Sequence, residues 1–279
     1  MDFVAKKGKE QSTEMTTQQW NAQDYARNSS AQWKWALELI EKLPLRGDET
    51  LLDIGCGDGK ITALLAERLP KGRAIGIDAS VAMVTLAQER FPAAETPNLS
   101  FRAMDATALD LPERFDAVFS NATLHWIVDH RAVLRGLSRC LNPGARILFQ
   151  MGGLGNTLGI EAAFRIRMED PRWREYFIGF QKPHHYYGPE EYHQWLPEAG
   201  FCPRRVELIP KDMQHEGAEG LKGWLRTTWF PYTNHVPEAQ RDTFLSEVLD
   251  AYLTAHPLDE QDKTHVAMVR LEVEAEFLG

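Results

Sequence analysis

The sequence predicts an α/β protein with a doubly wound, mostly parallel sheet, and two observations carry that prediction. Short apolar runs of strand character alternate with helical patterns over residues 51–150. The first run, Leu51–Ile54, leads directly into Gly55, Gly57 and Gly59, and a helical pattern follows. Strand, glycine turn and helix in this order begin a nucleotide-binding βαβ unit, because glycine allows positive φ and leaves the backbone open to a ligand.

The spacing of the glycines separates two classes of ligand. A dinucleotide fingerprint, G-x-G-x-x-G, would place its third glycine at position 60, where this chain has Lys60. The pattern here is G-x-G-x-G, and the acidic Asp53 precedes it. A carboxylate at that place is electrostatically favourable beside a ligand's ammonium group. A glycine turn that serves only chain reversal is the alternative interpretation.

Composition excludes several other classes of protein. The net charge of −9 over 279 residues argues against nucleic acid as the main partner, since phosphate binding needs a basic face. Cys56, Cys140 and Cys202 form no CxxC pair, so neither a disulfide framework nor a zinc site is predicted. The polar residues 1–10 lack the apolar core of a signal peptide, and no apolar run approaches the length of a membrane span. We therefore expect a cytoplasmic protein; the oligomeric state is not indicated.

Two aromatic residues precede the first predicted helix. Trp20 and Tyr25 either anchor the N-terminal segment or cover a bound ligand, and the two interpretations are compatible. The helix itself is predicted from a cap at Ser29 or Ser30 to Pro44, with Trp33, Leu37 and Ile40 as its apolar positions.

The second and third predicted strands each lead to an acidic residue. Asp78 ends the strand 73–78, about twenty residues beyond the glycines, where an acid in a βαβ unit reaches the ribose hydroxyls. The alternative is that Asp78 caps the next helix, although Ser80 is the better cap. The strand 99–103 precedes Asp105, which could accept a hydrogen bond from an adenine amine at the ligand-binding edge of the sheet.

The fourth predicted strand, 115–119, ends at the segment Ser120–Trp126. Asn121 can bind the ligand here, while His125 and Trp126 face a second substrate. The alternative for these two is a surface histidine and a core tryptophan. A turn at 141–144 then precedes the fifth strand, 146–150.

Beyond residue 150 the regular alternation stops. Residues 152–188 are too long for a simple connection and rich in aromatic residues, ending in His184-His185-Tyr186-Tyr187, so we predict a cap over the carboxyl edge of the sheet. No acid or cysteine near the paired histidines completes a metal site, and none is predicted. A helix over 189–200 follows.

The last part of the chain is predicted to complete the sheet. A strand over 201–209 and an alternating strand over 265–277 flank helices in which Trp224 is a core residue. Arg226 and Trp229 fall on another helix face, which could hold a carboxylate, although a solvated arginine is the simpler interpretation. The predicted divisions are a disordered tail (1–15), an N-terminal helix that covers the cofactor (16–45), a cofactor-binding core (46–152), a cap insertion (153–200) and a completion of the core (201–279) with cap helices around 217–256.

Four motifs together resemble the class I S-adenosylmethionine (SAM) methyltransferases: Asp53–Gly59, Gly76–Ser80, Ser120–Trp126 and Leu141–Gly144. More narrowly, the N-terminal segment, the Asn-Ala-x-Leu-His-Trp run and the cap resemble the trans-aconitate methyltransferase group. The resemblance covers nearly the whole chain. It implies a Rossmann-like seven-stranded sheet whose last strand is antiparallel, an aromatic-rich helical cap, SAM as cofactor, and methyl ester formation on a small carboxylic acid.

The resemblance also implies roles for particular residues. Asp53 and the three glycines would line the methionine end of the cofactor, Asp78 the ribose and Asp105 the adenine. The full cofactor set is Trp20, Tyr25, Asp53, Gly55, Cys56, Gly57, Gly59, Asp78, Ala79, Met83, Asp105, Ala106, Asn121, Ala122 and Leu124. The acceptor would lie against His125, Trp126, His185, Tyr186, Arg226 and Trp229, with His125 as the catalytic candidate if the acceptor needs a base.

One departure from the family bears on the acceptor. Phe230 stands before Pro231 where the family often has arginine, which favours a more apolar acceptor than a tricarboxylate unless Arg226 substitutes. Carboxylate methylation is therefore the first hypothesis. Methylation of an acyl-carrier-bound, lipid or natural-product hydroxyl group is the second, and a non-catalytic SAM-binding protein is the third.

Overall fold

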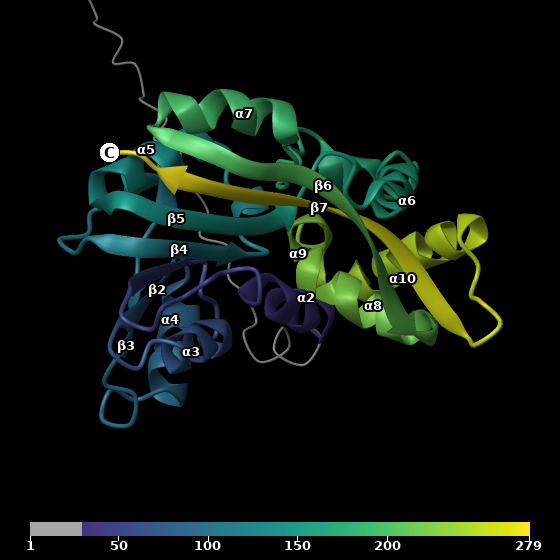
Figure 1. Ribbon diagram of the computed structural model, residues 1–279. Helices are drawn as coiled ribbons and strands as arrows, with labels where there is room; N and C mark the ends of the chain where they lie inside the picture. Colours follow the sequence, from purple (N-terminus) through teal and green to yellow (C-terminus); the bar gives the residue numbers. More distant parts are fainter. Residues whose placement is uncertain (1–29) are drawn as a thin grey trace, which may run out of the picture.

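The computed structural model describes residues 30–279, which form a seven-stranded sheet with helices on both faces (Figure 1). The strand order is β3-β2-β1-β4-β5-β7-β6. β1 to β5 are parallel, and β7 runs antiparallel between β5 and β6. The predicted doubly wound sheet with an antiparallel last strand is confirmed. The strands are β1 Thr50–Ile54, β2 Arg73–Asp78, β3 Leu99–Ala103, β4 Phe115–Asn121, β5 Leu141–Gly152, β6 Phe201–Glu216 and β7 Lys263–Phe277.

Alternation along the central strands supplies two cores, one on each face of the sheet. Leu51 of β1 joins one core, which α2, α3 and α4 cover; Leu52 joins the other, which α5 and α7 cover. The helices on these two faces lie above and below the sheet in Figure 1. Their bounds are α2 Ser30–Ile40, α3 Lys60–Glu67, α4 Val81–Arg90, α5 His130–Cys140 and α7 Pro189–Glu198.

A third apolar cluster forms where β6 and β7 extend beyond the rest of the sheet. The pairing of β5 with β7 ends at Gly152 and Arg270, while β6 and β7 stay paired as far as Glu216 and Lys263. The extended ends curve past α8 and α10 (Figure 1). The helices of this region are α6 Leu158–Met168, α8 Gly217–Thr228, α9 Phe230–Thr233 and α10 Glu238–Ala255, and the short 3-10 turns of the chain are η1 Ala106–Ala108, η2 Leu124–Trp126 and η3 Arg174–Phe177.

Two strand boundaries differ from the prediction. β6 continues past residue 209 in a pairing with β7 alone, and there the exposed polar residues Asp212 and Gln214 alternate with the buried Met213. The residues predicted as a turn at 141–144 belong to β5. Leu141 pairs with Phe115, and the register then shifts before Ala117 meets Arg146, so the Asn-Pro-Gly sequence is an irregularity within the strand.

The N-terminal helix α2 packs through a stripe that shares only Ile40 with the predicted one. Ala36, Leu39 and Ile40 are buried, whereas Trp33 and Leu37 are 38% and 37% exposed. Both stripes have helical spacing, so periodicity alone does not choose between them.

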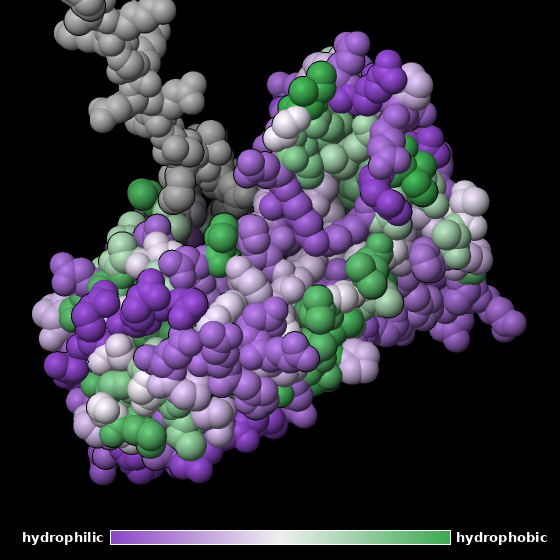
Figure 2. Space-filling view, turned by 90° about the horizontal axis from the view of Figure 1, so that it is seen from above, coloured by the Kyte–Doolittle hydropathy of each residue, from purple (hydrophilic) through white to green (hydrophobic). Residues whose placement is uncertain are grey.

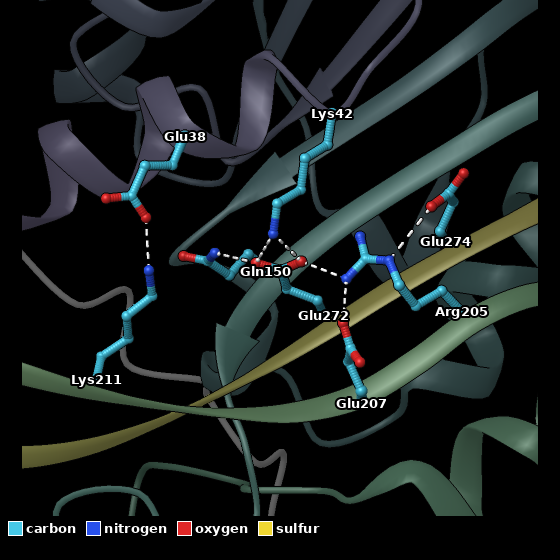
Figure 3. Close-up of polar contacts among 8 residues, drawn as sticks. All are labelled: Glu38, Lys42, Gln150, Arg205, Glu207, Lys211, Glu272 and Glu274. Atoms are coloured by element: carbon cyan, nitrogen blue, oxygen red, sulfur yellow. Dashed lines mark hydrogen bonds and ion pairs between the residues drawn. The ribbon is translucent and has the colours of Figure 1, made fainter.

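A charged network holds α2 and the residue after its end against the sheet (Figure 3). The buried carboxylate of Glu272 on β7 accepts hydrogen bonds from Lys42 Nζ at 2.7 and 2.9 Å, from Gln150 Nε2 at 2.9 Å and from Arg205 at 2.5 Å. An exposed ion pair joins Lys211 of β6 to Glu38 of α2 at 2.5 Å. Three strands and α2 thus meet at one carboxylate.

The face shown in Figure 2 is mostly hydrophilic, and its apolar residues gather in separate areas rather than in one patch. Within residues 30–279 no helix has the length and apolar character needed to cross a membrane. The predicted tail at 1–15 and the proposed contacts of Trp20 and Tyr25 lie outside the described residues.

Candidate active site

The glycine loop between β1 and α3 has three glycines at positive φ, and the space around them differs. The φ angles of Gly55, Gly57 and Gly59 are 76°, 52° and 81°. A Cβ on Gly55 would lie 2.1 Å from the Thr123 side chain, and one on Gly59 would lie 2.7 Å from Phe101 Cζ. A Cβ on Gly57 would meet nothing within 4 Å. The outer glycines therefore permit tight packing, while the middle one leaves backbone open at the place where a cofactor is expected.

Asp78 ties the end of β2 to this loop. Its Oδ2 accepts a hydrogen bond from the Gly57 N–H at 3.0 Å, and its Oδ1 accepts one from the Ser80 N–H at 2.8 Å. Ser80, not Asp78, is the N-cap of α4, with its hydroxyl accepting from the Met83 N–H. Burial raises the pKa of Asp78. Because each carboxylate oxygen has further lone pairs, both remain able to accept from ribose hydroxyls.

Asp53 is the acidic residue of β1 that precedes the glycine loop. It is 2% exposed and accepts a hydrogen bond from Thr62 Oγ1 at 2.6 Å. Burial, with a smaller contribution from the nearby Asp78, raises its pKa to about 7. A cationic group bound beside Asp53 would favour its charged form.

The other predicted cofactor residues follow the carboxyl ends of the first four strands. Asp105 caps η1, its Oδ1 accepting from the Thr107 N–H at 2.8 Å and hydroxyl at 2.9 Å. Ala122 follows β4, and its N–H donates to the Gln150 carbonyl at 2.8 Å. Of the remainder, Cys56, Met83, Ala106 and Leu124 are buried, Asn121 is half-buried and Ala79 is exposed. The sheet thus brings these residues to one edge, which is the ligand edge of a doubly wound fold.

His125 is a neutral imidazole with an assignable tautomer. It is 9% exposed, and burial together with the positive charge of Arg270 holds its pKa well below the ordinary value. Its Nδ1 accepts a hydrogen bond from the Gly152 N–H at 3.4 Å. The ring proton therefore lies on Nε2, so the free edge of His125 is a donor.

His130 fixes the short helix that carries His125. Its Nε2 donates to the Leu124 carbonyl at 2.7 Å, and its Nδ1 accepts from the Tyr192 hydroxyl at 2.8 Å. Burial lowers its pKa to about 4, so this arrangement of protons holds at neutral pH. Nothing in the local sequence around His130 indicates this role, because Tyr192 lies 62 residues away.

A cavity of about 60 Å³ adjoins His125. Four of the predicted acceptor residues line it: His125, Trp126, Tyr186 and Trp229. The other lining residues are Trp35, Ala122, Asn156, Thr157, His184, Met213, Trp224, Thr228, Met268 and Arg270. They come from α2, from the segments after β4 and β5, from the predicted cap, and from β6, α8 and β7.

Two predicted acceptor residues lie elsewhere. His185 is half-buried and donates its backbone N–H to the His125 carbonyl at 2.8 Å, while the ring of the buried His184 lines the cavity. Arg226 is exposed on α8 and is absent from the cavity lining, where the cation is Arg270. Trp229, the residue directly after α8, is buried and lines the cavity, although regular helical spacing would place it on the same face as Arg226.

Aromatic rings and strained backbone shape the cavity wall. The Trp126 ring lies 4.3 Å from that of His184 and stacks at 6.5 Å on Phe230, the residue that departs from the family pattern. Ala122 and Thr157, both in the lining, have φ of 56°, which is unusual for residues other than glycine. Such conformations are characteristic of functional sites.

Comparison with known proteins agrees with this geometry. Residues 51–144 match the family model described as a methyltransferase domain. The uncharacterized methyltransferase C70.08c of Schizosaccharomyces pombe is 33% identical over 198 residues, which cover 69% of this chain and 74% of that protein. The chain belongs to the class I SAM-dependent methyltransferases. The trans-aconitate 2-methyltransferase of Shigella flexneri serotype 5b is 29% identical to this methyltransferase over 92% of the chain and 97% of its own length.

Comparison with solved structures shows that the fold is shared. The crystal structure of the YcgJ protein from Bacillus subtilis has a TM-score of 0.61 and 18% identity, and covers 88% of this methyltransferase and 99% of YcgJ. SAM is accordingly the cofactor of this methyltransferase. The loop fits it, because the open backbone at Gly57 lies beside two acids, Asp53 and Asp78, and no cradle for a pyrophosphate is needed.

Proposed function

We propose that this methyltransferase transfers a methyl group to a carboxylate oxygen of a small carboxylic acid. The observation that carries the proposal is the tautomer of His125. Its Nδ1 accepts from the Gly152 N–H, so the ring nitrogen that remains for a molecule in the adjoining cavity is Nε2–H, a donor and not a base. Phenol, ammonium or carbon-acid acceptors require removal of a proton, whereas a carboxylate is already ionised at neutral pH.

When bound, SAM supplies a methyl group on a positively charged sulfur; a carboxylate oxygen bonds to that methyl carbon as the carbon–sulfur bond breaks, leaving a neutral ester and a neutral thioether. No proton is transferred. The protein's contribution is alignment and exclusion of water. We assign to His125 a hydrogen bond to the acceptor, and to Trp126, Tyr186 and Trp229 the walls that keep it in line.

The cofactor assignments made from the sequence belong to the same proposal. Asp53 would face the ammonium group, Asp78 the ribose and Asp105 the adenine, each at the end of a parallel strand. Residues 153–200 together with α8 and α9 would act as a cap over the reacting groups. The cavity lining supports this, since Asn156, His184 and Thr228 come from those segments.

The relatives and the cavity together narrow the acceptor. Several relatives are named trans-aconitate 2-methyltransferases, which supports carboxylate chemistry. The aromatic lining, and Phe230 stacked on the lining residue Trp126, favour an acceptor with an apolar body and one carboxylate over a tricarboxylate.

The test is incubation of the pure protein with methyl-labelled SAM and a panel of acids from trans-aconitate to octanoate. Label recovered in a base-labile volatile product is expected from at least one acid. The amide of the best acid is the matched control, since it has the same shape and no carboxylate, and it should take no label. Transfer only to hydroxyl or carrier-bound acceptors would contradict the proposal, and binding of SAM without any transfer would indicate a non-catalytic protein.

A further inference from the structure

We propose that Arg270 is the residue that binds the carboxylate of the methyl acceptor. The inference rests on the proposed function, and it names the group that recognises the substrate class. It starts from the charge of the cavity. Among the described residues that line it, Arg270 is the one with a full charge at neutral pH, because His125 and His184 have lowered pKa values.

Arg270 belongs to the same structural unit as His125. It lies on β7 and is 3% exposed. Its partner in the β5–β7 register is Gly152, whose N–H donates to His125 Nδ1. Burial and, after it, the positive charge of Arg270 lower the pKa of His125. Burial raises the pKa of Tyr186 to about 12, and the charge of Arg270 opposes that rise with a minor contribution. The β5–β7 strand pair thus carries both Arg270 and the N–H that holds His125, and both side chains line the same cavity.

Two described residues near Arg270 bear on its charge. Trp35 of α2 provides a cation–π contact, with the guanidinium carbon 5.5 Å from the ring centroid. Glu272, two residues along the same face of β7, has its carboxylate engaged by Lys42, Gln150 and Arg205. The carboxylate of Glu272 is therefore part of the charged network beside α2.

Arginine suits this task for chemical reasons. Its planar guanidinium matches both oxygens of a carboxylate, and the two oxygens together retain lone pairs for bonding to the methyl carbon. After transfer the product is a neutral ester, which loses the ionic attraction to Arg270. The same contact that selects an anionic acceptor therefore weakens the binding of the product.

The experiment compares wild type with Arg270→Met, Arg270→Lys and the control Arg204→Met. Arg204 is also on the sheet, but it pairs with Glu276 at the surface, away from the cavity. Two readouts are measured: KM and kcat for the best acid, and binding of octanoate to the complex with S-adenosylhomocysteine (SAH) by tryptophan fluorescence. The second readout is available because Trp35, Trp126, Trp224 and Trp229 line the cavity.

We expect Arg270→Met to raise KM about 100-fold and to weaken octanoate binding equally, with SAH affinity unchanged. Arg270→Lys keeps the charge but loses the planar fork, so about a tenfold rise in KM is expected. If Arg270→Met does not fold, the KM of Arg270→Lys tests the role of Arg270. Arg204→Met should behave as wild type.

The two proposals fail in different ways. If acids are methylated and neither Arg270 variant changes KM or octanoate binding, the role of Arg270 is overturned and carboxylate methylation stands. If no acid is methylated but octanoate binds the SAH complex only when Arg270 is present, the site recognises carboxylates and the reaction assignment is overturned. If no acid of the panel is methylated and octanoate does not bind the SAH complex, both are overturned.

Discussion

At the scale of single residues, one backbone contact determines what His125 can do. The Gly152 N–H occupies Nδ1, and burial keeps the ring neutral, so the proton must lie on Nε2. A side chain that the sequence offers as a general base becomes a hydrogen-bond donor in the folded protein. The difference is invisible in the sequence because Gly152 lies 27 residues further along the chain.

The donor and base roles of His125 predict different activities for its variants. The amide nitrogen of His125→Gln can stand in for Nε2–H but cannot accept a proton there. If His125 donates, the glutamine variant should keep kcat within about tenfold of wild type, while His125→Ala loses about 100-fold. SAH affinity, measured by calorimetry, should stay unchanged in both. Equal losses in the two variants would favour the base.

Asp53 predicts a pH dependence of cofactor binding. Its pKa is raised to about 7 in the free protein, mainly by burial, and an ammonium group placed beside it would lower that pKa in the complex. SAH affinity should therefore rise with pH through 7, about tenfold between pH 6 and pH 8, and level off above. Asp53→Asn should bind SAH with no such dependence. If the SAH affinity of wild type does not change with pH, Asp53 does not bind the ammonium group.

At the scale of elements, the carboxylate of Glu272 joins α2 to three strands, and its loss should destabilise the fold. Burial alone would raise the pKa of Glu272, but hydrogen bonds from Lys42, Arg205 and Gln150 hold it below the ordinary value. Glu272→Gln should lower the free energy of unfolding at pH 7 by about 2 kcal/mol, because it removes the buried charge that the partly exposed Lys42 and Arg205 share.

The pH dependence of that loss follows from the lowered pKa. The charged form stabilises the fold above the unfolded-state pKa of about 4.3, and this contribution disappears as pH falls through the lower folded-state value. Urea unfolding should therefore show a smaller difference between Glu272→Gln and wild type near pH 4 than at pH 7. The control is Glu276→Gln, which affects a partly exposed pair on the same strand and should cost about 0.5 kcal/mol or less. Equal effects of the two variants would show that the network does not hold α2.

At the scale of the whole molecule, the sequence predicts features made by residues close together in the chain. It does not predict those that distant segments form together. The glycine loop, the acids after β2 and β3 and the order of the parallel strands could be predicted, because each depends on residues close together in the chain. The cavity could not, since each of its many segments supplies only a few lining residues. Arg270 illustrates this: it stands between Val269 and Leu271 in an alternating strand, and only its register opposite Gly152 places it with His125. Arg226, by contrast, lies on a helix that periodicity does predict, but it does not line the cavity.

The net charge of the molecule predicts opposite salt effects for its two substrates. At −9 the protein repels an anionic acceptor and attracts SAM, which carries a net positive charge. The Debye length shortens from about 30 Å to about 8 Å between 0.01 M and 0.15 M ionic strength, so the long-range repulsion and attraction are both screened. Over that range kcat/KM for octanoate should rise about twofold and more for trans-aconitate, while the affinity for SAM falls. The zwitterionic SAH is the matched control and should bind with nearly constant affinity. A fall of kcat/KM for the acids with salt would mean that local positive potential at the cavity, with Arg270 as its source, outweighs the charge of the whole molecule.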